Sequence, residues 1–406
     1  MSVVVTLATA PLVAWTFGRV ALLGPATNLL ADPVMALLQP VLFLGLAVPI
    51  HAVETLAADA AHVLLALFAR LAHVAAAVPG AAPFVSPTFV GAIAAGLASA
   101  ALLVACCAER YGRALVVVGA ALAVIVVEPL VPHRGSPELH MLDVGQGDAL
   151  ALRTGRGRWI VIDAGRIWDG GDAGSRTVAP YLAHRGGAVE LFVLSHPHAD
   201  HVGGAASLLM LRPPARFLDP GYVGTTQSYR AALAAARRQG IPWQRVHPGD
   251  SVVVDDVVLT VLAPDSIWTA GLRDANLASA VIVARIGAVR VLFTGDAEAE
   301  QEDWLVDRYG DGDGGALRAD ILKVAHHGSR TSTTPRFLAA VQPRLALVSV
   351  GAQNAYGHPD DEVLGRLAAA GVPVLRTDRL GTVVLRATGS RIEVRARDQR
   401  WMLLGP

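Results

Sequence analysis

Residues 195–204 read Ser-His-Pro-His-Ala-Asp-His-Val-Gly-Gly, and this stretch decides the fold expected for the C-terminal two-thirds of the chain. It follows an apolar run at residues 191–194, Leu-Phe-Val-Leu, which predicts a buried strand that ends at Ser195. Gly203 and Gly204 allow the backbone to pass close beneath a site at the end of that strand. The pattern therefore predicts a strand, a polar turn and the start of a helix.

The polar turn has the composition of a metal site. His196 and His198 alternate on an extended segment, so both imidazoles can face one ion. Asp200 and His201 come one step later, where the chain turns into a helix, and can face a second ion. Imidazole and carboxylate groups suit zinc or manganese and need no cysteine. A polar loop that happens to hold three histidines is the alternative.

Complementary groups recur downstream and favour the metal site. Asp296 ends an expected strand over residues 291–296, and His326 and His327 end another over residues 321–327. These segments together resemble the metallo-β-lactamase superfamily of di-metal hydrolases, whose ligands lie on loops at strand ends. The resemblance implies two divalent metal ions, Zn²⁺ or Mn²⁺. We expect His196 and His198 on the first ion, Asp200 and His201 on the second, Asp296 between them, and His326 or His327 completing the second.

One ligand expected from the resemblance is missing. Hydrolases of this superfamily commonly place a further histidine between the cluster and the bridging aspartate. Here the only histidine in that interval is His247, in a Val-His-Pro-Gly-Asp segment that predicts a turn. Asn276, Ser279 or water could replace it, and an enzyme with one metal ion is an open alternative.

Composition divides the chain in two. It has 406 residues, of which 53% are hydrophobic and 5% aromatic, and its mean hydropathy of +0.45 is too high for one soluble globule. The apolar excess lies in the first third, so we expect a membrane part over residues 1–135 and a hydrolase domain over residues 136–406. The net charge of zero gives no overall basic signal for nucleic acid. Cys106 and Cys107 are adjacent and form no disulfide framework.

Within the membrane part, hydropathy predicts several helices. Residues 2–17, 27–50, 88–108 and 114–131 are apolar enough to span or nearly span a bilayer. Residues 51–79 alternate polar and apolar groups at helical spacing, which predicts an amphipathic helix on the membrane surface or against other helices.

The arginine distribution predicts the orientation in the membrane. Arg110 and Arg113, in the loop before the last span, favour the cytoplasmic side. Arg19 falls on the same side if residues 27–50 cross once. The chain then leaves the membrane after residue 131 on the extracytoplasmic face.

Two sets of motifs narrow the family. Residues 17–25, Phe-Gly-Arg-Val-Ala-Leu-Leu-Gly-Pro, resemble the later membrane segments of the ComEC family of competence DNA-uptake channels. Residues 143–149 (Asp-Val-Gly-Gln-Gly-Asp-Ala), 294–296 (Thr-Gly-Asp) and 326–329 (His-His-Gly-Ser) are similar, in this order, to the C-terminal domain of that family. A full member begins earlier, so the chain resembles the C-terminal part only. The alternating helices and strands of residues 138–406 also favour a four-layer αββα sandwich.

The expected chemistry is phosphodiester hydrolysis. Asp200 would serve both as metal ligand and in catalysis, and Lys323, Ser329 and His358 would hold phosphate oxygens or protonate the leaving group. Asp163 is expected to orient a ligand histidine, while Asp143 and Asp148 are expected more often to cap turns than to bind metal.

The resemblance implies a membrane-anchored, metal-dependent nuclease associated with DNA uptake. Its expected partners are DNA, the membrane and other subunits of a competence channel. Its expected location is the cell membrane, crossed several times, with the hydrolase domain outside. A hydrolase of another envelope ester, and a channel or scaffold subunit with an inert domain, are the alternatives.

Overall fold

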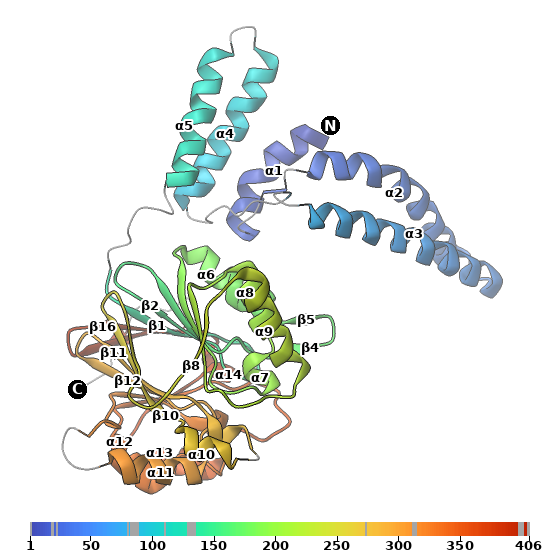
Figure 1. Ribbon diagram of the computed structural model, residues 1–406. Coiled ribbons are helices and arrows are strands. Elements are labelled where there is room, and N and C mark those ends of the chain that lie inside the picture. Colours follow the sequence, from blue (N-terminus) through green and yellow to red (C-terminus); the bar gives the residue numbers. More distant parts are fainter. Residues whose placement is uncertain are drawn as a thin grey trace. The chain divides into compact units, whose positions relative to one another are not determined.

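The computed structural model describes residues 2–17, 20–21, 23–78, 81, 89–108, 111–127, 135–272, 274–310, 315–396 and 402–403. The chain forms two compact units, one of residues 1–131 with 183–186 and one of residues 132–182 with 187–406 (Figure 1). The boundary expected at residue 135 follows residues 128–134, which lie outside the described residues.

The first unit is helical. Its helices are α1 Ser2–Phe17, α2 Gly24–Ala47, α3 His51–Ala77, α4 Phe89–Cys107 and α5 Gly112–Val127. Helix α2 packs along α3, and α4 packs along α5. A Cβ at Gly45 would lie 3.0 Å from that of Ala57, so the absence of a side chain lets α2 approach α3 closely.

Helices α2, α3 and α4 are long and apolar enough to span a membrane, whereas α1 and α5 fall short of the usual length. Helix α3, predicted to lie on the membrane surface or against other helices, packs against α2 and is also a candidate span. Its polar residues are outnumbered by Ala and Leu, which give it a hydropathy of 1.7. Leu56 and Val63, 71% and 66% exposed, are suited to contact lipid. Of the arginines used to predict the orientation, Arg19 and Arg110 lie outside the described residues.

Among the described residues, the second unit holds two large sheets. The strands of the first, in spatial order, are β18 Met402–Leu403, β17 Arg391–Ala396, β16 Val383–Thr388, β1 Glu138–Met141, β2 Leu150–Arg153, β3 Trp159–Ile162, β6 Val189–Val193, β7 Arg216–Asp219 and β8 Trp243–Arg245. Those of the second are β15 Val374–Arg376, β14 Leu345–Val348, β13 Ile321–Lys323, β12 Val289–Phe293, β11 Val281–Ile286, β10 Val257–Ala263 and β9 Ser251–Val254. A hairpin of β4 Ile167–Trp168 and β5 Gly171–Asp172 lies apart.

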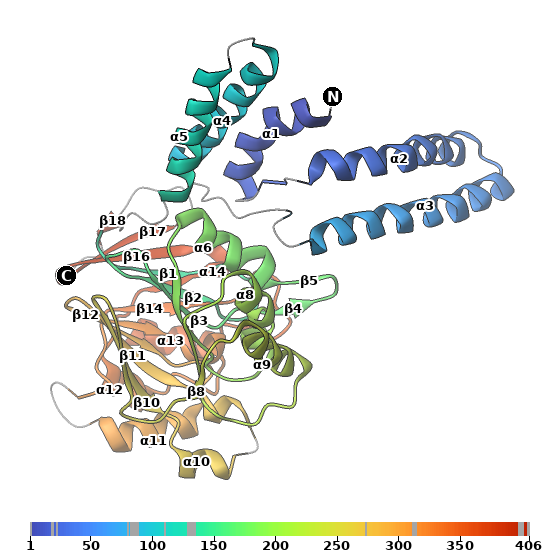
Figure 2. The same cartoon turned by 45° about the horizontal axis from the view of Figure 1, so that its top comes forward.

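Alternate side chains along the strands point into different hydrophobic cores, and this arrangement forms the layers of the domain. In β3, Ile160 and Ile162 belong to a core shared by strands of both sheets, whereas Trp159 and Val161 face a second core. Successive side chains of a strand point to opposite faces, so each central strand is buried on both sides. The outer cores are completed by helices, which are α6 Ala179–Arg185, α8 Ala205–Leu211 and α9 Gln227–Gln239 on one sheet, and α11 Ala299–Tyr309, α12 Pro335–Val341 and α13 Asp361–Ala369 on the other. The predicted αββα sandwich is thus confirmed (Figure 2).

The parallel strands bring the motifs to one edge. In the first sheet β3, β6 and β7 are parallel, and in the second β12, β13 and β14 are parallel. The predicted site residues follow the carboxyl ends of these strands, before or within short helices such as α7 Ala199–Val202. Segments far apart in sequence therefore meet where the two sheets meet.

Candidate metal centre

The backbone around the centre adopts conformations that residues other than glycine rarely adopt. Asp163, His326 and His327 have φ values of 59°, 48° and 53°, in the left-handed region. Such conformations persist where the surrounding structure fixes them, and they concentrate at functional sites. Gly147 shows a second constraint, because a Cβ there would lie 2.1 Å from the carbonyl oxygen of Asp200. Only glycine allows these two turns to approach so closely.

The four side chains expected to bind the second ion lie close together. His201 Nε2 lies 3.2 Å from Asp296 Oδ1, and His327 Nε2 lies 3.5 Å from Asp296 Oδ2. His327 Nε2 is also 3.3 Å from Asp200 Oδ2 and 3.3 Å from His201 Nε2. The structure thus brings Asp200, His201, Asp296 and His327 together. These separations suit groups that share one small cation with ligand bonds of about 2.0–2.2 Å.

Two of the remaining three histidines face Asp296 Oδ2, the oxygen that His327 also faces. His196 Nε2 is 3.1 Å from His198 Nδ1 and 3.8 Å from Asp296 Oδ2. His326 Nε2 is 3.9 Å from the same Asp296 oxygen. His326 therefore reaches the oxygen that His196 also faces.

Neighbouring groups orient these rings. Asp163 Oδ2 lies 2.8 Å from His201 Nδ1, and its two oxygens also accept hydrogen bonds from the backbone N–H and hydroxyl of Ser195. His327 Nδ1 lies 2.9 Å from the carbonyl oxygen of Ser349, so it can donate to that oxygen. With Nδ1 engaged, both rings turn Nε2 toward Asp296, which is the arrangement that holds a histidine ligand in one tautomer.

Glu298 orients His326 in the same way. His326 Nδ1 lies 3.1 Å from Glu298 Oε1, and Asn276 donates a 3.3 Å hydrogen bond to the same oxygen. The hydroxyl of Ser279 accepts a hydrogen bond from the backbone N–H of Asp296. Asn276 and Ser279, considered as replacements for a missing ligand, thus contact Glu298 and Asp296. His247 is about half exposed in its turn, where its backbone N–H bonds to Asp250.

Asp148, expected to cap a turn, lies within the candidate metal centre. It is 1% exposed and forms an ion pair with the ammonium of Lys323, which also donates to the carbonyl oxygen of Gly295. Asp148 Oδ1 is 3.3 Å from His327 Nδ1. One ligand atom from each of Asp148, His201, Asp296 and His327 lies within 4.8 Å of the others. The position of Asp148 at the end of the Gln-Gly-Asp turn was the available sequence signal.

Lys323 and His358 occupy different environments. Lys323 is fully buried, so its ammonium faces Asp148 and Asp296 from within the domain and is not placed to touch substrate. His358 is partly exposed, and its ring centre lies 5.7 Å from that of His326. Burial and the neighbouring His326 lower the pKa of His358 below its usual value. Ser329 is buried and its hydroxyl contacts that of Thr331.

The charges of the centre fit divalent cations. Four carboxylates, of Asp148, Asp163, Asp200 and Asp296, face one ammonium, and Asp296 Oδ1 is buried without a hydrogen bond among the described residues. Carboxylates buried without compensation are costly.

The pKa values of His201 and His327 show the same excess of negative charge, whereas burial and the neighbouring His201 lower the pKa of His196. Burial alone would lower the pKa of His327, but Asp296 and Asp148 outweigh it and raise that pKa to about 9. The same balance, with Asp296 and Asp163 as the main partners, raises the pKa of His201 well above its usual value. Cations bound by these rings would replace the protons, so the donor set suits one or two divalent metal ions.

Two family models match the chain. The metallo-beta-lactamase superfamily matches residues 142–352, and the competence protein family matches residues 1–111. The two segments follow each other in the order expected from the motifs.

Several curated proteins are similar over long stretches. Competence protein ComA of Neisseria gonorrhoeae is 29% identical over 388 residues, which cover 92% of this chain and 49% of that protein. ComE operon protein 3 of Bacillus subtilis (strain 168) is 31% identical over 263 residues, covering 61% of this chain and 33% of that protein. The chain therefore spans between a third and a half of the length of these relatives.

Two solved structures are similar to part of the chain at low sequence identity. CmlA, a diiron β-hydroxylase from Streptomyces venezuelae, has a TM-score of 0.42 at 14% identity over 63% of this chain and 55% of its own. Igni18, a metallo hydrolase from the archaeon Ignicoccus hospitalis KIN4/I, has a TM-score of 0.41 at 15% identity over 62% of this chain and 100% of its own.

Proposed function

The chain belongs to the metallo-β-lactamase superfamily, and on this premise we propose that it is a membrane-anchored, metal-dependent phosphodiesterase that cleaves DNA during uptake. The observation that carries the proposal is that histidine side chains converge on both carboxylate oxygens of Asp296. The competence segment at residues 1–111 supports DNA as the substrate.

Each residue of the centre has a proposed part. When bound, two divalent ions would lower the pKa of water toward neutrality and polarise the phosphodiester. Asp200 and Asp296, with the histidines, would hold the ions. Lys323 would fix Asp148 and Asp296 in place and would not contact substrate. His358, partly exposed beside His326, would give a proton to the leaving oxygen.

The test of this function is reconstitution of the purified chain. The protein is stripped of metal with EDTA, supplied with Mn²⁺ or Zn²⁺, and mixed with labelled DNA and with a small chromogenic phosphodiester. We expect cleavage of both substrates only when metal is restored. Hydrolysis of the small diester with DNA left intact would favour an envelope ester as substrate. Inactivity toward both substrates with metal bound would favour an inert scaffold.

We further propose that His326 belongs to the first ion rather than the second. His326 is not part of the buried cluster of Asp148, His201, Asp296 and His327. Glu298 binds the Nδ1 of His326 so that its Nε2 faces Asp296 Oδ2, as that of His196 does. His326 would thus supply the ligand that the sequence lacks between His201 and Asp296.

The prediction for His326→Ala concerns metal stoichiometry. The variant should keep one ion tightly bound and bind the other at least about 10-fold more weakly, because only the first group loses a ligand. Equilibrium dialysis with Mn²⁺ measures both affinities without relying on activity. His247→Ala, at an exposed histidine, is the matched control and should bind as the wild type does. Two unchanged sites in His326→Ala would contradict the assignment.

The proposed orientation places the hydrolase domain outside the cell membrane. If α3 spans, Arg19 and Arg113 fall on opposite sides, so the prediction rests on Arg110 and Arg113 together. The exit after residue 131 is unchanged, because it depends only on the last span. A phosphatase reporter fused after Pro406 should be active, and a cytoplasmic reporter at that position should be silent. The reverse pattern would overturn the orientation.

A further inference from the structure

A cavity of about 440 Å³ lies beside the metal centre, and its lining suits a nucleobase. It is lined by Gln146, Arg166, Trp168, Gly351 and Asn354, among others. The guanidinium carbons of Arg166 and Arg176 each lie 5.7 Å from the centre of the Trp168 ring. The volume falls within the ~300–1,000 Å³ typical of small-molecule sites.

This first cavity is tied to the metal centre by short contacts. Gln146 comes two residues before Asp148, and its side-chain oxygen accepts a hydrogen bond from the backbone N–H of Gly351. Asn354 donates to the carbonyl oxygen of His358 and accepts from its N–H. The turn at residues 146–148 also contacts Asp200, because the backbone N–H of Asp148 donates a hydrogen bond to the carbonyl oxygen of Asp200. The cavity wall therefore continues into the ligand loops.

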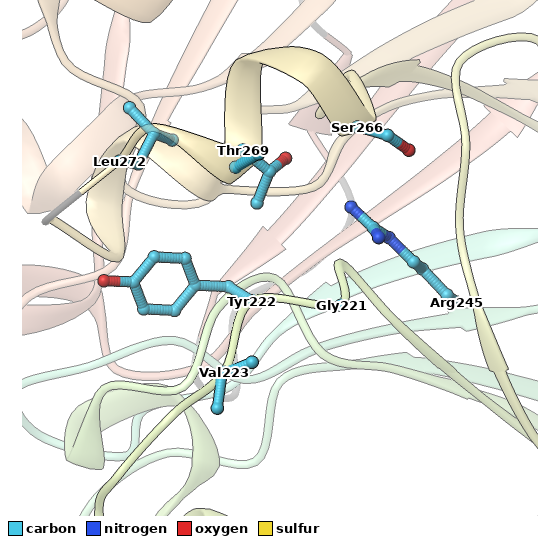
Figure 3. A pocket seen from close by; sticks show the side chains of 8 residues that line it. Gly221, Tyr222, Val223, Arg245, Ser266, Thr269 and Leu272 are labelled. Atoms are coloured by element: carbon cyan, nitrogen blue, oxygen red, sulfur yellow. The ribbon is translucent and has the colours of Figure 1, made fainter.

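A second cavity, of about 350 Å³, adjoins the same histidine loop at another point. Figure 3 shows Arg245 reaching toward Ser266, with Tyr222 and Thr269 also lining the space. The Nε atom of Arg245 is buried and makes no hydrogen bond within the part of the chain that the structure describes. An anionic ligand oxygen would supply a partner for this donor.

The loop that forms this second cavity touches the metal-binding turn. A Cβ at Gly224 would lie 2.6 Å from the Cβ of Pro197, and Thr226 donates a 3.1 Å hydrogen bond to the carbonyl oxygen of Pro197. The two cavities thus adjoin the turn at residues 196–201, one at Pro197 and one at Asp200. An extended ligand that entered both would pass the metal ligands between them.

We propose that these cavities are subsites for a single-stranded polynucleotide whose backbone crosses the metal centre. The inference rests on the proposed phosphodiesterase function and names its substrate. Trp168 would stack on a base, and the unpaired N–H of Arg245 would bind a phosphate oxygen. A paired duplex keeps its bases stacked inside the helix and cannot offer one to Trp168.

The charges around Trp168 determine how binding at this subsite should depend on electrostatics. Asp169 and Asp172 lie in the same hairpin region as Arg166 and Arg176, so the patch is locally balanced. Asp172 is already engaged by Ser175 and Ser207. Binding at this subsite should therefore depend on stacking and individual hydrogen bonds, and only modestly on a broad positive field.

Binding of a labelled single-stranded oligonucleotide to the full chain in detergent, with EDTA present to prevent cleavage, tests the proposal. Fluorescence anisotropy should show that Trp168→Ala and Arg245→Ala each weaken binding about 5-fold or more, since one stacked base is worth roughly 1–3 kcal/mol. Trp168→Phe should restore most of the affinity, because it keeps an aromatic face. The same single strand should bind more tightly than its duplex.

Arg391→Ala, which removes an exposed arginine of β17, is the matched control and should bind like the wild type. Wild-type binding by Trp168→Ala and Arg245→Ala, or equal affinity for duplex, would overturn the proposal. Strand binding that depends on Trp168 in a chain that cleaves nothing would refute the proposed activity alone. Cleavage of DNA by a chain whose binding ignores Trp168 would refute only the subsites.

Discussion

Replacing Asp296 with alanine should abolish metal-dependent cleavage of DNA, lowering the rate by more than about 100-fold. That loss exceeds the 10–100-fold typical of residues that only orient ligands. Its carboxylate oxygens lie 3.2–3.5 Å from the Nε2 atoms of His201 and His327. They lie 3.8–3.9 Å from the Nε2 atoms of His196 and His326. No other carboxylate described in the structure touches both groups, so both ions would lose a ligand at once.

The measurement combines initial cleavage rates with the metal content of the same samples. Circular dichroism should show a folded domain, because Asp296 lies in the turn after β12 and belongs to none of the hydrophobic core clusters. His198→Ala should also lose activity, through the first group alone. Asp303→Ala, at an exposed carboxylate of α11, is the matched control. Wild-type turnover by Asp296→Ala with two ions bound would rule out the bridging role.

Replacing Lys323 with methionine should destabilise the metal-free chain by about 3–5 kcal/mol, the range for removing one partner of a buried ion pair. Lys323 and Asp148 are both buried, and the ammonium is the only lysine charge available to this carboxylate. Burial would raise the pKa of Asp148, but Lys323 and then His327 hold it at about 2. Without the ammonium, a charged carboxylate remains buried with too few partners.

Thermal unfolding in EDTA measures this effect apart from metal binding. The melting temperature should fall by roughly 6–20 °C, given a shift of about 2–4 °C per kcal/mol for a domain of this size. The double variant Asp148→Asn with Lys323→Met should recover part of the loss, because neither buried charge remains. Arg336→Met breaks exposed pairs with Asp303 and Asp307 and should leave the melting temperature nearly unchanged. An unchanged melting temperature for Lys323→Met would show that Asp148 is compensated elsewhere.

The sequence by itself determined the class of the protein and most of the residues that converge at the candidate metal centre. The succession of strands and helices predicted the sandwich, and the spacing of residues 196–201 predicted the turn of the candidate metal centre, because both depend on local geometry. The family matches confirm the resemblance to the ComEC family that the motifs indicated. The apolar first third likewise predicted membrane helices. Residues 51–77, predicted as an amphipathic helix, also proved long and apolar enough to be a candidate span.

Only the tertiary structure decided how these residues divide between roles. His326 and His327 are adjacent in sequence, yet left-handed backbone turns one toward Glu298 and the other toward Asp148. Lys323 was expected to meet substrate, but β13 carries it into the core, where it pairs with Asp148 from the other sheet. A side chain's role at such a site depends on which strand ends lie beside it. That neighbourhood is set by the order of strands in two packed sheets, and local sequence patterns do not record it.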